Sequence, residues 1–437
     1  MEKEELFTKD DMEIRKKANQ NIEKYRKGEA EINIVDSDGK RLSNLDIEIE
    51  LVNHEFKFGG WPWLPRKSAH YRISDRQAKE LYTEHYCDLF NCGTAMMYWD
   101  EKEGFPHWER KQGQVEHKFI DQLTDWARKN NIKLKGHPLA WTKPNSLPDW
   151  LIDSSKRARK IYLEAHVRKL VSSFAGIIDE WDVVNEVLWE PVWENMDNRS
   201  WPNFEEIDDI IDFVLPLFKW AREENPAADL LINEYGLEVD KKQISAENQR
   251  KRYREIIARL LTEGGFPDAI GLQTHEGAIN ASSKKLWEIW DYFSELGIPL
   301  HLTEIGCDAN IIESGGQYRG ENWNKTVAIL AYQNMYRIGF GHPNVEAIIT
   351  YNTLHNGYQY SGKPNWIYEA LHKLISEEWQ TRKNIKTNDR GILNFRGFYG
   401  DYKIDITTES GKIVRKKFSL NKIDDNQVTY VIPKRYQ

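Results

Sequence analysis

The feature that most constrains the fold is a regular alternation of short apolar runs with amphipathic stretches through the middle of the chain. A strand that is buried on both faces reads as a short apolar run, whereas a helix packed against it repeats its apolar residues with a period near 3.6. The runs predict strands at Glu55–Gly59, Cys92–Tyr98, Lys133–His137, Asp179–Asn185, Leu230–Asn233, Ala269–Gln273, Pro299–Thr303 and Ala347–Tyr351. The stretches that follow them predict helices at Asp75–Phe90, His117–Asn130, Lys156–Phe174, Glu205–Glu224, Lys241–Glu263, Ser282–Leu296, Asn322–Ile338 and Asn365–Trp379.

A series of eight strand–helix units predicts an α/β fold of the TIM (β/α)8 barrel type, which we assign to residues 54–384. An open, doubly wound sheet is the alternative. That fold usually has a glycine-rich turn after its first strand, and no Gly-x-Gly-x-x-Gly follows any predicted strand here.

The two ends of the chain show a different pattern. Residues 1–28 predict a polar N-terminal helix, and residues 29–53 alternate apolar and polar side chains around a turn at Asp36–Gly39. Residues 385–437 contain further short alternating runs. Because neither end has enough strands to bury an apolar face alone, we expect 29–53 and 385–437 to form one small accessory β-sandwich beside the barrel.

Charge and cysteine content exclude several classes of protein. The net charge of −8 argues against a surface that neutralises nucleic-acid phosphates, and no apolar run is long enough to span a membrane. Three cysteines without a Cys-x-x-Cys pair predict neither a disulfide framework nor a zinc ribbon, and the histidines show no metal-ligand spacing. We therefore expect no metal, no cofactor, no nucleic-acid partner and no membrane partner, and the sequence leaves the oligomeric state open.

The first 26 residues are charged throughout and have no apolar segment of the kind found in signal peptides. We accordingly expect a cytoplasmic protein, or a secreted one if a native leader has been replaced by Met1.

Polar residues stand where several predicted strands end, which in a TIM barrel is the edge that carries the active site. Glu186 ends the fourth strand and Glu304 ends the seventh. These two ends lie across the barrel mouth from each other, so the two carboxylates can work from opposite sides of one bond. Further side chains at or just beyond strand ends are His137, Trp141, Asn185, Gln273, His275, Trp99 and Tyr351.

Two carboxylates on opposite sides of one bond suit the hydrolysis of a glycoside with retention of configuration. One carboxylic acid protonates the leaving oxygen, while the other, ionised, attacks the anomeric carbon from about 5–5.5 Å away. Burial and the negative charge of its partner keep the acid protonated near neutral pH. The 17 Trp and 20 Tyr residues provide flat rings suited to sugars, although aromatic rings also serve core packing.

Several motifs occur in one order along the chain. They are Phe56-Lys-Phe-Gly59, Gly136-His-Pro-Leu-Ala-Trp141, Leu147-Pro-Asp-Trp150, Trp181-Asp-Val-Val-Asn-Glu186, Asn233-Glu-Tyr235, Gly271-Leu-Gln-Thr-His275 and Leu302-Thr-Glu304. Together they resemble the motifs of family-10 glycoside hydrolases, whose best-known members are endo-β-1,4-xylanases. The resemblance covers the whole barrel, and its most specific part is the string that ends in Glu186.

The resemblance implies a role for each matching residue. Glu186 would be the general acid/base and Glu304 the nucleophile. Asn185 would bind the 2-hydroxyl of the sugar in the −1 subsite, where His137 and Trp141 would also contact it. His275 would orient or charge-tune the nucleophile, with Gln273 beside it. We further expect Trp99, Trp141 and Tyr351 to line the cleft.

This sequence departs from the family pattern at the second strand, where members usually have Glu-Asn-x-x-Lys-Trp around the −1 sugar. Here the string reads Thr94-Ala-Met-Met-Tyr98-Trp99, so all three polar residues are replaced. Thr142 stands where a second His is common, and no Trp occurs in Ile349–Leu354, although Tyr351 and Tyr358 could stack on a sugar instead.

The sequence thus predicts a retaining β-glycoside hydrolase, of endo-β-1,4-xylanase type, whose partner is a polysaccharide or oligosaccharide such as xylan. A β-glycosidase of the same fold that acts on another β-linked or decorated sugar is the first alternative. A carbohydrate-binding barrel with weakened or lost catalysis is the second alternative.

Overall fold

The computed structural model describes residues 6–62, 75–100, 102, 106–193, 202–241, 243–275, 279–306, 317–318, 321–322, 324–351 and 364–434. Eight parallel strands within these residues close into a barrel, in the spatial order β12-β3-β4-β5-β6-β7-β8-β9. The TIM barrel predicted from the sequence is confirmed. The strands are β3 (Lys57–Gly60), β4 (Cys92–Met96), β5 (Lys133–His137), β6 (Ile178–Asn185), β7 (Asp229–Glu234), β8 (Ala269–Leu272), β9 (Leu300–Ile305) and β12 (Val345–Thr350).

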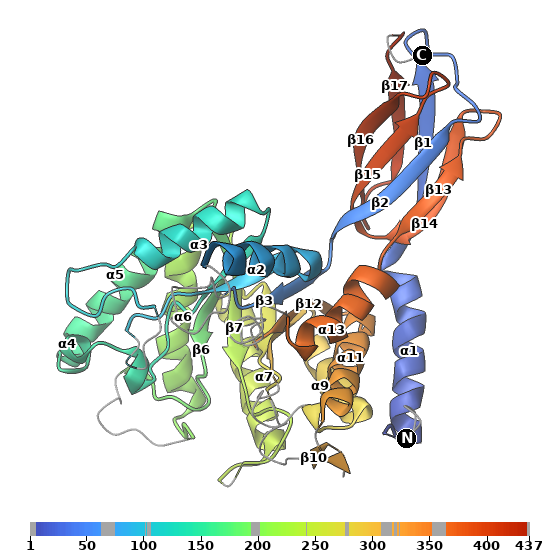
Figure 1. Ribbon diagram of the computed structural model, residues 1–437. Coiled ribbons are helices and arrows are strands. Elements are labelled where there is room, and N and C mark those ends of the chain that lie inside the picture. The colour runs from blue at the N-terminus through green and yellow to red at the C-terminus, as the bar shows by residue number, and fades with distance from the viewer. Residues whose placement is uncertain are drawn as a thin grey trace.

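Helices surround the barrel and connect its strands (Figure 1). Several begin at a Ser or Asn whose side-chain oxygen accepts a backbone N–H of the first turn, which is how these residues start helices. Such caps are Ser155, Ser245, Ser282, Asn324 and Asn365. The helices are α2 (Asp75–Leu89), α3 (Lys118–Lys129), α5 (Lys156–Phe174), α6 (Ile207–Glu224), α7 (Ala246–Glu263), α9 (Ser283–Ser294), α11 (Lys325–Gly341) and α13 (Trp366–His372), which continues as the π-helical turn η3 (Lys373–Glu378).

Shorter elements occur in the loops between the strands and helices. The 3-10 turn η1 (Pro144–Ser146) and the helix α4 (Asp149–Ile152) follow β5. The strands β10 (Gln317–Tyr318) and β11 (Glu321–Asn322) pair in the connection between β9 and α11.

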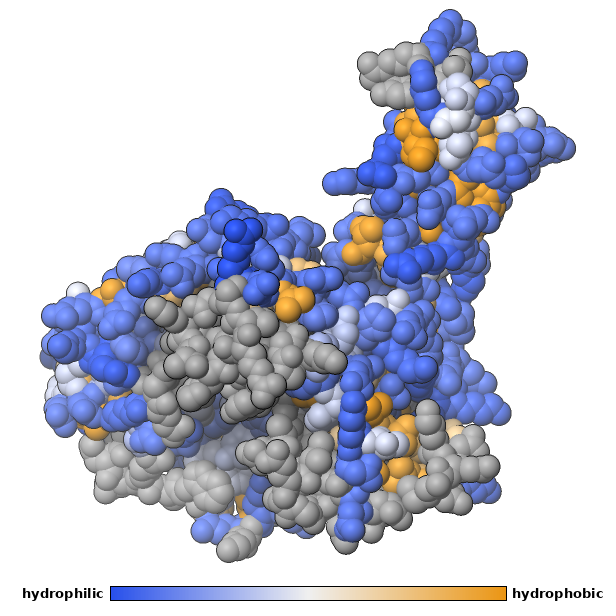
Figure 2. Space-filling view, viewed as in Figure 1, coloured by the Kyte–Doolittle hydropathy of each residue, from blue (hydrophilic) through white to orange (hydrophobic). Residues whose placement is uncertain are grey.

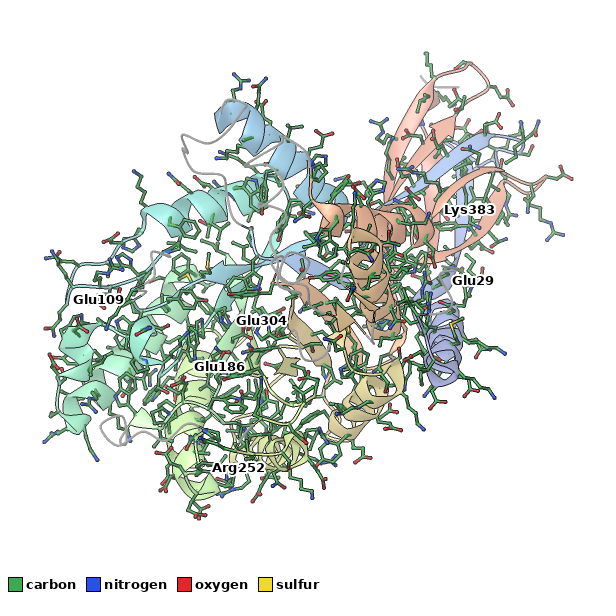
Figure 3. The ribbon with its side chains drawn as sticks, turned by 60° about the horizontal axis from the view of Figure 1, so that its bottom comes forward. Glu29, Glu109, Glu186, Arg252, Glu304 and Lys383 are labelled. Carbon is green, nitrogen blue, oxygen red and sulfur yellow. The ribbon has the colours of Figure 1, made fainter. Side chains whose placement is uncertain are left out.

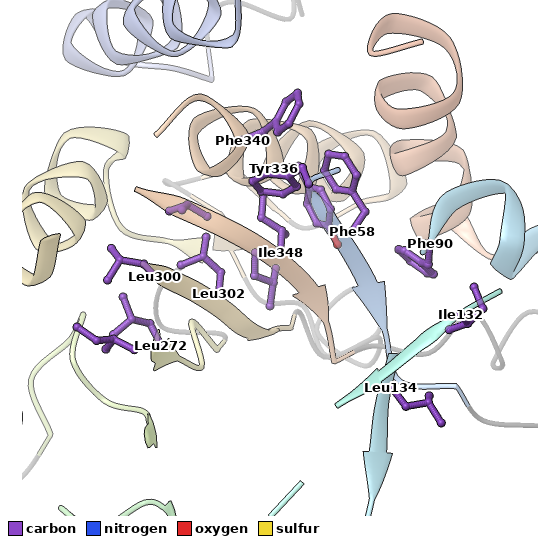
Figure 4. Packing of buried hydrophobic residues seen from close by; sticks show 14 of the residues in the cluster. Phe58, Phe90, Ile132, Leu134, Leu272, Leu300, Leu302, Tyr336, Phe340 and Ile348 are labelled. Atoms are coloured by element: carbon purple, nitrogen blue, oxygen red, sulfur yellow. The ribbon is translucent and has the colours of Figure 1, made fainter. Parts of the chain in front are cut away.

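The hydrophobic core lies between the outer side of the barrel strands and the helices (Figure 4). Phe58 on β3 packs with its ring centroid 5.1 Å from that of Phe340 on α11. Leu302 and Ile348 on neighbouring strands are also fully buried in this layer. At roughly 1.5–3 kcal/mol for each fully buried large apolar side chain, this layer drives the closure of the barrel.

The two chain ends form the accessory sandwich, as predicted. β1 (Lys27–Asp36) pairs with β14 (Ile392–Phe398) and with β17 (Gln427–Ile432) in one sheet. The other sheet has the order β13-β2-β15-β16, formed by β2 (Asp46–His54), β13 (Arg382–Lys386), β15 (Gly400–Thr407) and β16 (Ile413–Leu420). The predicted boundary between residues 384 and 385 is wrong by a few residues, because it divides β13, which pairs with β2 along its whole length.

The N-terminal helix α1 (Lys9–Tyr25) packs on the barrel, against α9 and α11. Gly341 on α11 leaves room for this contact, since an added Cβ would lie 2.5 Å from Ala18. Asp11 is fully buried, and its Oδ1 accepts a hydrogen bond of 2.7 Å from the backbone N–H of Ser283 at the start of α9. The helix therefore forms part of the barrel's outer layer.

Arg26 connects α1 and the start of the sandwich to the barrel. Its guanidinium is buried and donates to three backbone oxygens around the end of α11, those of Phe340, His342 and Val345, at 2.6 to 2.8 Å. It also lies over the ring of Phe56. Burial lowers the pKa of Arg26 to about 10, well above neutral pH, so the group stays charged.

Replacing Arg26 with Ala is expected to lower the free energy of unfolding by about 2–4 kcal/mol, because buried carbonyl oxygens lose their donor. Arg396→Ala is the control, since Arg396 is 41% exposed and pairs with the exposed Glu29 on the sandwich surface. We expect less than about 0.5 kcal/mol from this change. Urea denaturation of both variants measures the difference, and equal losses would contradict the assigned role of Arg26.

Where Figure 2 colours the surface by hydropathy, that surface is mostly hydrophilic, and its apolar residues form small patches. No helix among the described residues combines the length and the apolar character that crossing a bilayer requires.

Candidate active site

Backbone hydrogen bonds align the carboxyl ends of four neighbouring strands. The N–H of Glu186, after β6, donates to Asn233 O at 2.9 Å, and the N–H of Gln273, after β8, donates to Glu234 O at 2.8 Å. The N–H of Glu304 on β9 donates to Gln273 O at 3.0 Å. These bonds place Glu186 and Glu304 in the same region of the barrel, where Figure 3 labels both.

A chain of side-chain amides connects the two carboxylates. Gln273 Nε2 donates to Glu186 Oε1 at 3.1 Å and to Asn185 Oδ1 at 3.2 Å. Asn233 Nδ2 donates to the same Asn185 oxygen and to Glu304 Oε1, both at 2.9 Å. Since Asn185, Gln273 and Asn233 are almost fully buried, this chain fixes the positions of both carboxylates.

Glu304 is held in its ionised form. Burial alone would raise its pKa, but a contact of 3.3 Å between its Oε2 and His275 Nε2, with the charges of His137 and Lys135, brings the pKa down to about 2. Burial acts against the charge of His275, yet Glu304 and further carboxylates outweigh it and raise the pKa of the imidazole. A buried carboxylate beside an imidazolium is suited to act as a nucleophile.

The pKa of Glu186 is shifted in the opposite direction, upward. Burial raises its pKa to about 7, helped by the negative charges of Glu304 and Glu190 and opposed by hydrogen bonds from Gln273 and Trp141. Two carboxyl groups in one site with pKa values pushed apart are what a proton donor and a nucleophile require.

His137 is the last residue of β5. Its Nδ1 is 2.7 Å from Asp182 Oδ2, and Lys135 Nζ is 2.6 Å from the same oxygen. All three side chains are almost completely buried. The contact with Asp182 orients the imidazole of His137.

Two of the predicted aromatic residues lie at the site. Trp141, in the loop after β5, donates from Nε1 to Glu186 Oε2 at 2.9 Å. Tyr351, just after β12, is 43% exposed and meets the rings of His275 and Trp61 edge to face.

The prediction that Trp99 lines the cleft is wrong. Trp99 is 5% exposed, and its ring stacks on that of His166, on α5, with centroids 3.8 Å apart. The predicted strand Cys92–Tyr98 ends earlier, at Met96, and the following loop bonds to a second segment through Glu109 N and Trp99 O. This loop directs Trp99 into the core beside α5.

The structure also gives a place in the site to three residues for which the sequence motifs predicted no role. Asp182 and Asn233 organise the site, and Trp61 contacts His137 and Tyr351. A charged residue in the middle of a buried strand was the available signal for Asp182. Trp61 comes directly after β3, so extending the inspection of strand ends to the first strand would have identified it.

Within the part of the chain that the structure describes, no group of three or more His, Cys, Asp or Glu side chains could hold a metal ion.

The sequence matches the family model described as Glycosyl hydrolase family 10 over residues 70–366. Among curated proteins, it is 26% identical over 430 residues to the anti-sigma-I factor RsgI6 of Acetivibrio thermocellus, covering 95% of this chain and 50% of that protein. It is 27% identical over 323 residues to an endo-1,4-beta-xylanase/feruloyl esterase of Xylanibacter ruminicola, covering 68% of this chain and 41% of that protein. The chain thus spans half or less of the length of these relatives.

Among solved structures, the fold is similar to that of xylanase 10B from Thermotoga petrophila, determined in complex with xylobiose. The TM-score is 0.52 at 20% identity, over 74% of this chain and 95% of that one. At this identity the similarity supports the barrel fold and carries no conclusion about substrate.

Proposed function

The chain belongs to glycosyl hydrolase family 10, and on that basis we propose that it hydrolyses β-glycosidic bonds with retention of configuration. The observation that carries this proposal is the pair of carboxyl groups at the ends of β6 and β9, Glu186 part-buried and Glu304 buried, whose pKa values are shifted in opposite directions. Such a pair supplies both groups that double displacement requires.

In the first step, the ionised Glu304 attacks the anomeric carbon while the protonated Glu186 donates its proton to the leaving oxygen. In the second step, Glu186 removes a proton from water, which attacks the glycosyl–Glu304 intermediate. Asn185 Oδ1 already accepts two amide hydrogen bonds. Its NH2 group has no partner among the described residues, so it is available to donate to a sugar hydroxyl.

We propose β-1,4-xylan as the polymer that is cleaved. Support comes from the family and from a curated relative named as an endo-1,4-beta-xylanase/feruloyl esterase. The resemblance of the strand-end motifs to those of this family also supports it.

One observation favours a different β-linked sugar as the second candidate. Tyr98 stands where the family usually has a lysine, and it is buried with Trp61, Met96 and Ile349 in a small apolar cluster that also contacts Trp141. This side of the site offers fewer hydrogen-bonding groups to a sugar than charged and amide side chains would.

A substrate panel tests the proposal. The enzyme is incubated with β-1,4-xylan, β-glucan and β-mannan, and with aryl β-xyloside, β-cellobioside and β-glucoside, and the released sugars are analysed. We expect products from xylan and from the aryl β-xyloside. Release from another substrate alone would favour the second candidate, and release from none would contradict hydrolase activity.

The value of kcat/KM is expected to fall as the pH rises above about 7, because Glu186 then loses the proton that it must donate. Glu304 is ionised down to a pH near 2, so the nucleophile imposes no limit in the neutral range. Initial rates on an unactivated oligosaccharide from pH 4 to 9 measure this limb. A rate that keeps rising through pH 8 would contradict the assignment of the acid.

Trp141→Phe is expected to move this alkaline limb upward by about half a unit to one unit, because it removes a hydrogen bond that lowers the pKa of Glu186. Trp99→Phe is the matched control, since Trp99 packs on His166 away from the carboxyl pair and its indole nitrogen has no hydrogen-bond partner among the described residues. The limb should stay in place in this variant. Equal shifts in the two variants would show that the hydrogen bond is not responsible.

A further inference from the structure

The backbone of Glu186 has a φ of +63°, in the left-handed region that a residue with a side chain seldom adopts. A turn follows directly, since the N–H groups of Trp189 and Glu190 both donate to Glu186 O at 3.0 and 2.9 Å. Such a conformation costs free energy and persists only where surrounding contacts hold it. The position of the acid therefore depends on whatever restrains this turn.

The side chain of Glu234 provides that restraint. Glu234 ends β7 and is fully buried. Its Oε2 accepts a 2.9 Å hydrogen bond from the N–H of Leu188, within the turn, and its Oε1 accepts one of 2.9 Å from the N–H of Tyr235. The carboxyl group thus ties the turn that carries Glu186 to the end of the neighbouring strand.

The backbone of the same strand adds to this connection. Asn233 O accepts the N–H of Glu186, and Glu234 O accepts the N–H of Gln273, the residue that donates to both Glu186 and Asn185. One strand end therefore holds the acid's backbone, the turn after it and the amide beside it.

The environment of Glu234 is unfavourable for a carboxyl group. No lysine or arginine pairs with it among the described residues, and burial together with the charges of Glu186 and Glu190 raises its pKa well above the usual value. Its two backbone N–H contacts oppose that shift. A buried carboxyl group without a cation lowers the stability of a fold, so stability alone does not explain the presence of Glu234.

We propose that Glu234 is a positioning residue for the reaction, which holds the left-handed turn so that the carboxyl group of Glu186 reaches the leaving oxygen. This inference rests on the proposed function. Glu234 acts through Glu186 and does not itself contact the sugar, so its loss should impair proton donation and leave nucleophilic attack largely intact.

The test compares kcat/KM on two substrates, an unactivated oligosaccharide and the corresponding nitrophenyl glycoside, which needs little help from an acid. In Glu234→Gln, one of the two carboxylate oxygens is replaced by an NH2 group. Because an NH2 group cannot accept a hydrogen bond from a backbone N–H, the side chain keeps only one of its two backbone hydrogen bonds. We expect the oligosaccharide value to fall at least about tenfold and the nitrophenyl value less than about threefold.

Asp268→Asn is the matched control. Asp268 Oδ2 also accepts a backbone N–H, that of Leu230 at 2.8 Å, but at the opposite end of β7. This variant should keep the wild-type ratio of the two kcat/KM values. If Glu234→Gln also keeps that ratio, or loses the same factor on both substrates, the inference is overturned.

Glu234→Asp provides a second variant if Glu234→Gln does not fold. It keeps the carboxylate but is one methylene shorter, so it cannot reach the N–H of Leu188 unless the turn moves. We expect the ratio to change in the same direction by a smaller factor, and an unchanged ratio would refute the inference. Two outcomes separate the inference from the proposed function. If the wild type is active and the activity lost in Glu186→Ala depends on the leaving group, but the activity lost in the Glu234 variants does not, only the inference is overturned. An inactive wild type would overturn the proposed function as well.

Discussion

Glu304→Ala is expected to lower turnover of every glycoside substrate by at least about 10⁴-fold, because no covalent intermediate forms without the attacking carboxylate. The loss should be the same for good and poor leaving groups, since the missing group acts on the anomeric carbon. Steady-state rates on an aryl glycoside and on an oligosaccharide measure it. Thermal unfolding should show that the variant remains folded, although Asn233 and His275 lose a partner.

Glu29→Ala is the control for this experiment, because Glu29 is exposed on the accessory sandwich, away from Glu304 (Figure 3). Its turnover should equal that of the wild type. Appreciable activity in Glu304→Ala, above what trace wild-type protein explains, would contradict the role assigned to this residue.

Glu186→Ala is expected to give a loss that depends on the leaving group. For an oligosaccharide, kcat/KM should fall about 10³-fold, because the departing sugar alkoxide needs a proton. A nitrophenolate leaves without one, so kcat/KM for the nitrophenyl glycoside should fall less than about tenfold. Deglycosylation still slows because water lacks its general base, and the glycosyl-enzyme should therefore accumulate.

Azide separates the roles of the two carboxylates by the stereochemistry of its product. In Glu186→Ala, azide attacks the glycosyl-enzyme without needing a base, which should restore turnover and yield the β-glycosyl azide. In Glu304→Ala, azide enters from the opposite face and any product is the α-glycosyl azide. Nuclear magnetic resonance identifies the anomer, and the reverse pattern would mean that the two roles are exchanged.

The sequence predicts the barrel well because the pattern that indicates each strand and helix lies within a short stretch of the chain. Each β/α unit combines a short apolar run with an amphipathic stretch, and a Ser or Asn marks the start of several helices. The ends of parallel strands share one edge, so the positions of Glu186 and Glu304 along their strands suffice to place them together.

Details that depend on contacts between distant segments are not encoded in such patterns. Trp99 follows its strand as Trp141 does, yet its loop bonds to the segment around Glu109 and turns the ring toward His166. The boundary of the sandwich was placed too late for a similar reason, since Arg382 belongs to β13 only through pairing with β2, more than 300 residues earlier.

The network inside the barrel is also a tertiary property. Lys135 and Asp182 lie on neighbouring strands and pair with each other in a buried position. In a single sequence, each resembles a polar interruption of a strand. Only the register of β5 and β6 shows that the two charges meet, and that His137 contacts the same carboxylate.

The configuration of the first sugar released tests the two-carboxylate account most directly. Proton nuclear magnetic resonance follows the anomeric signals during hydrolysis of a β-1,4-xylo-oligosaccharide, before mutarotation mixes the anomers. Double displacement through Glu304 and Glu186 predicts that the β-anomer forms first and the α-anomer appears later. Initial formation of the α-anomer would show a single displacement by water and would contradict the assignment of Glu304 as a nucleophile.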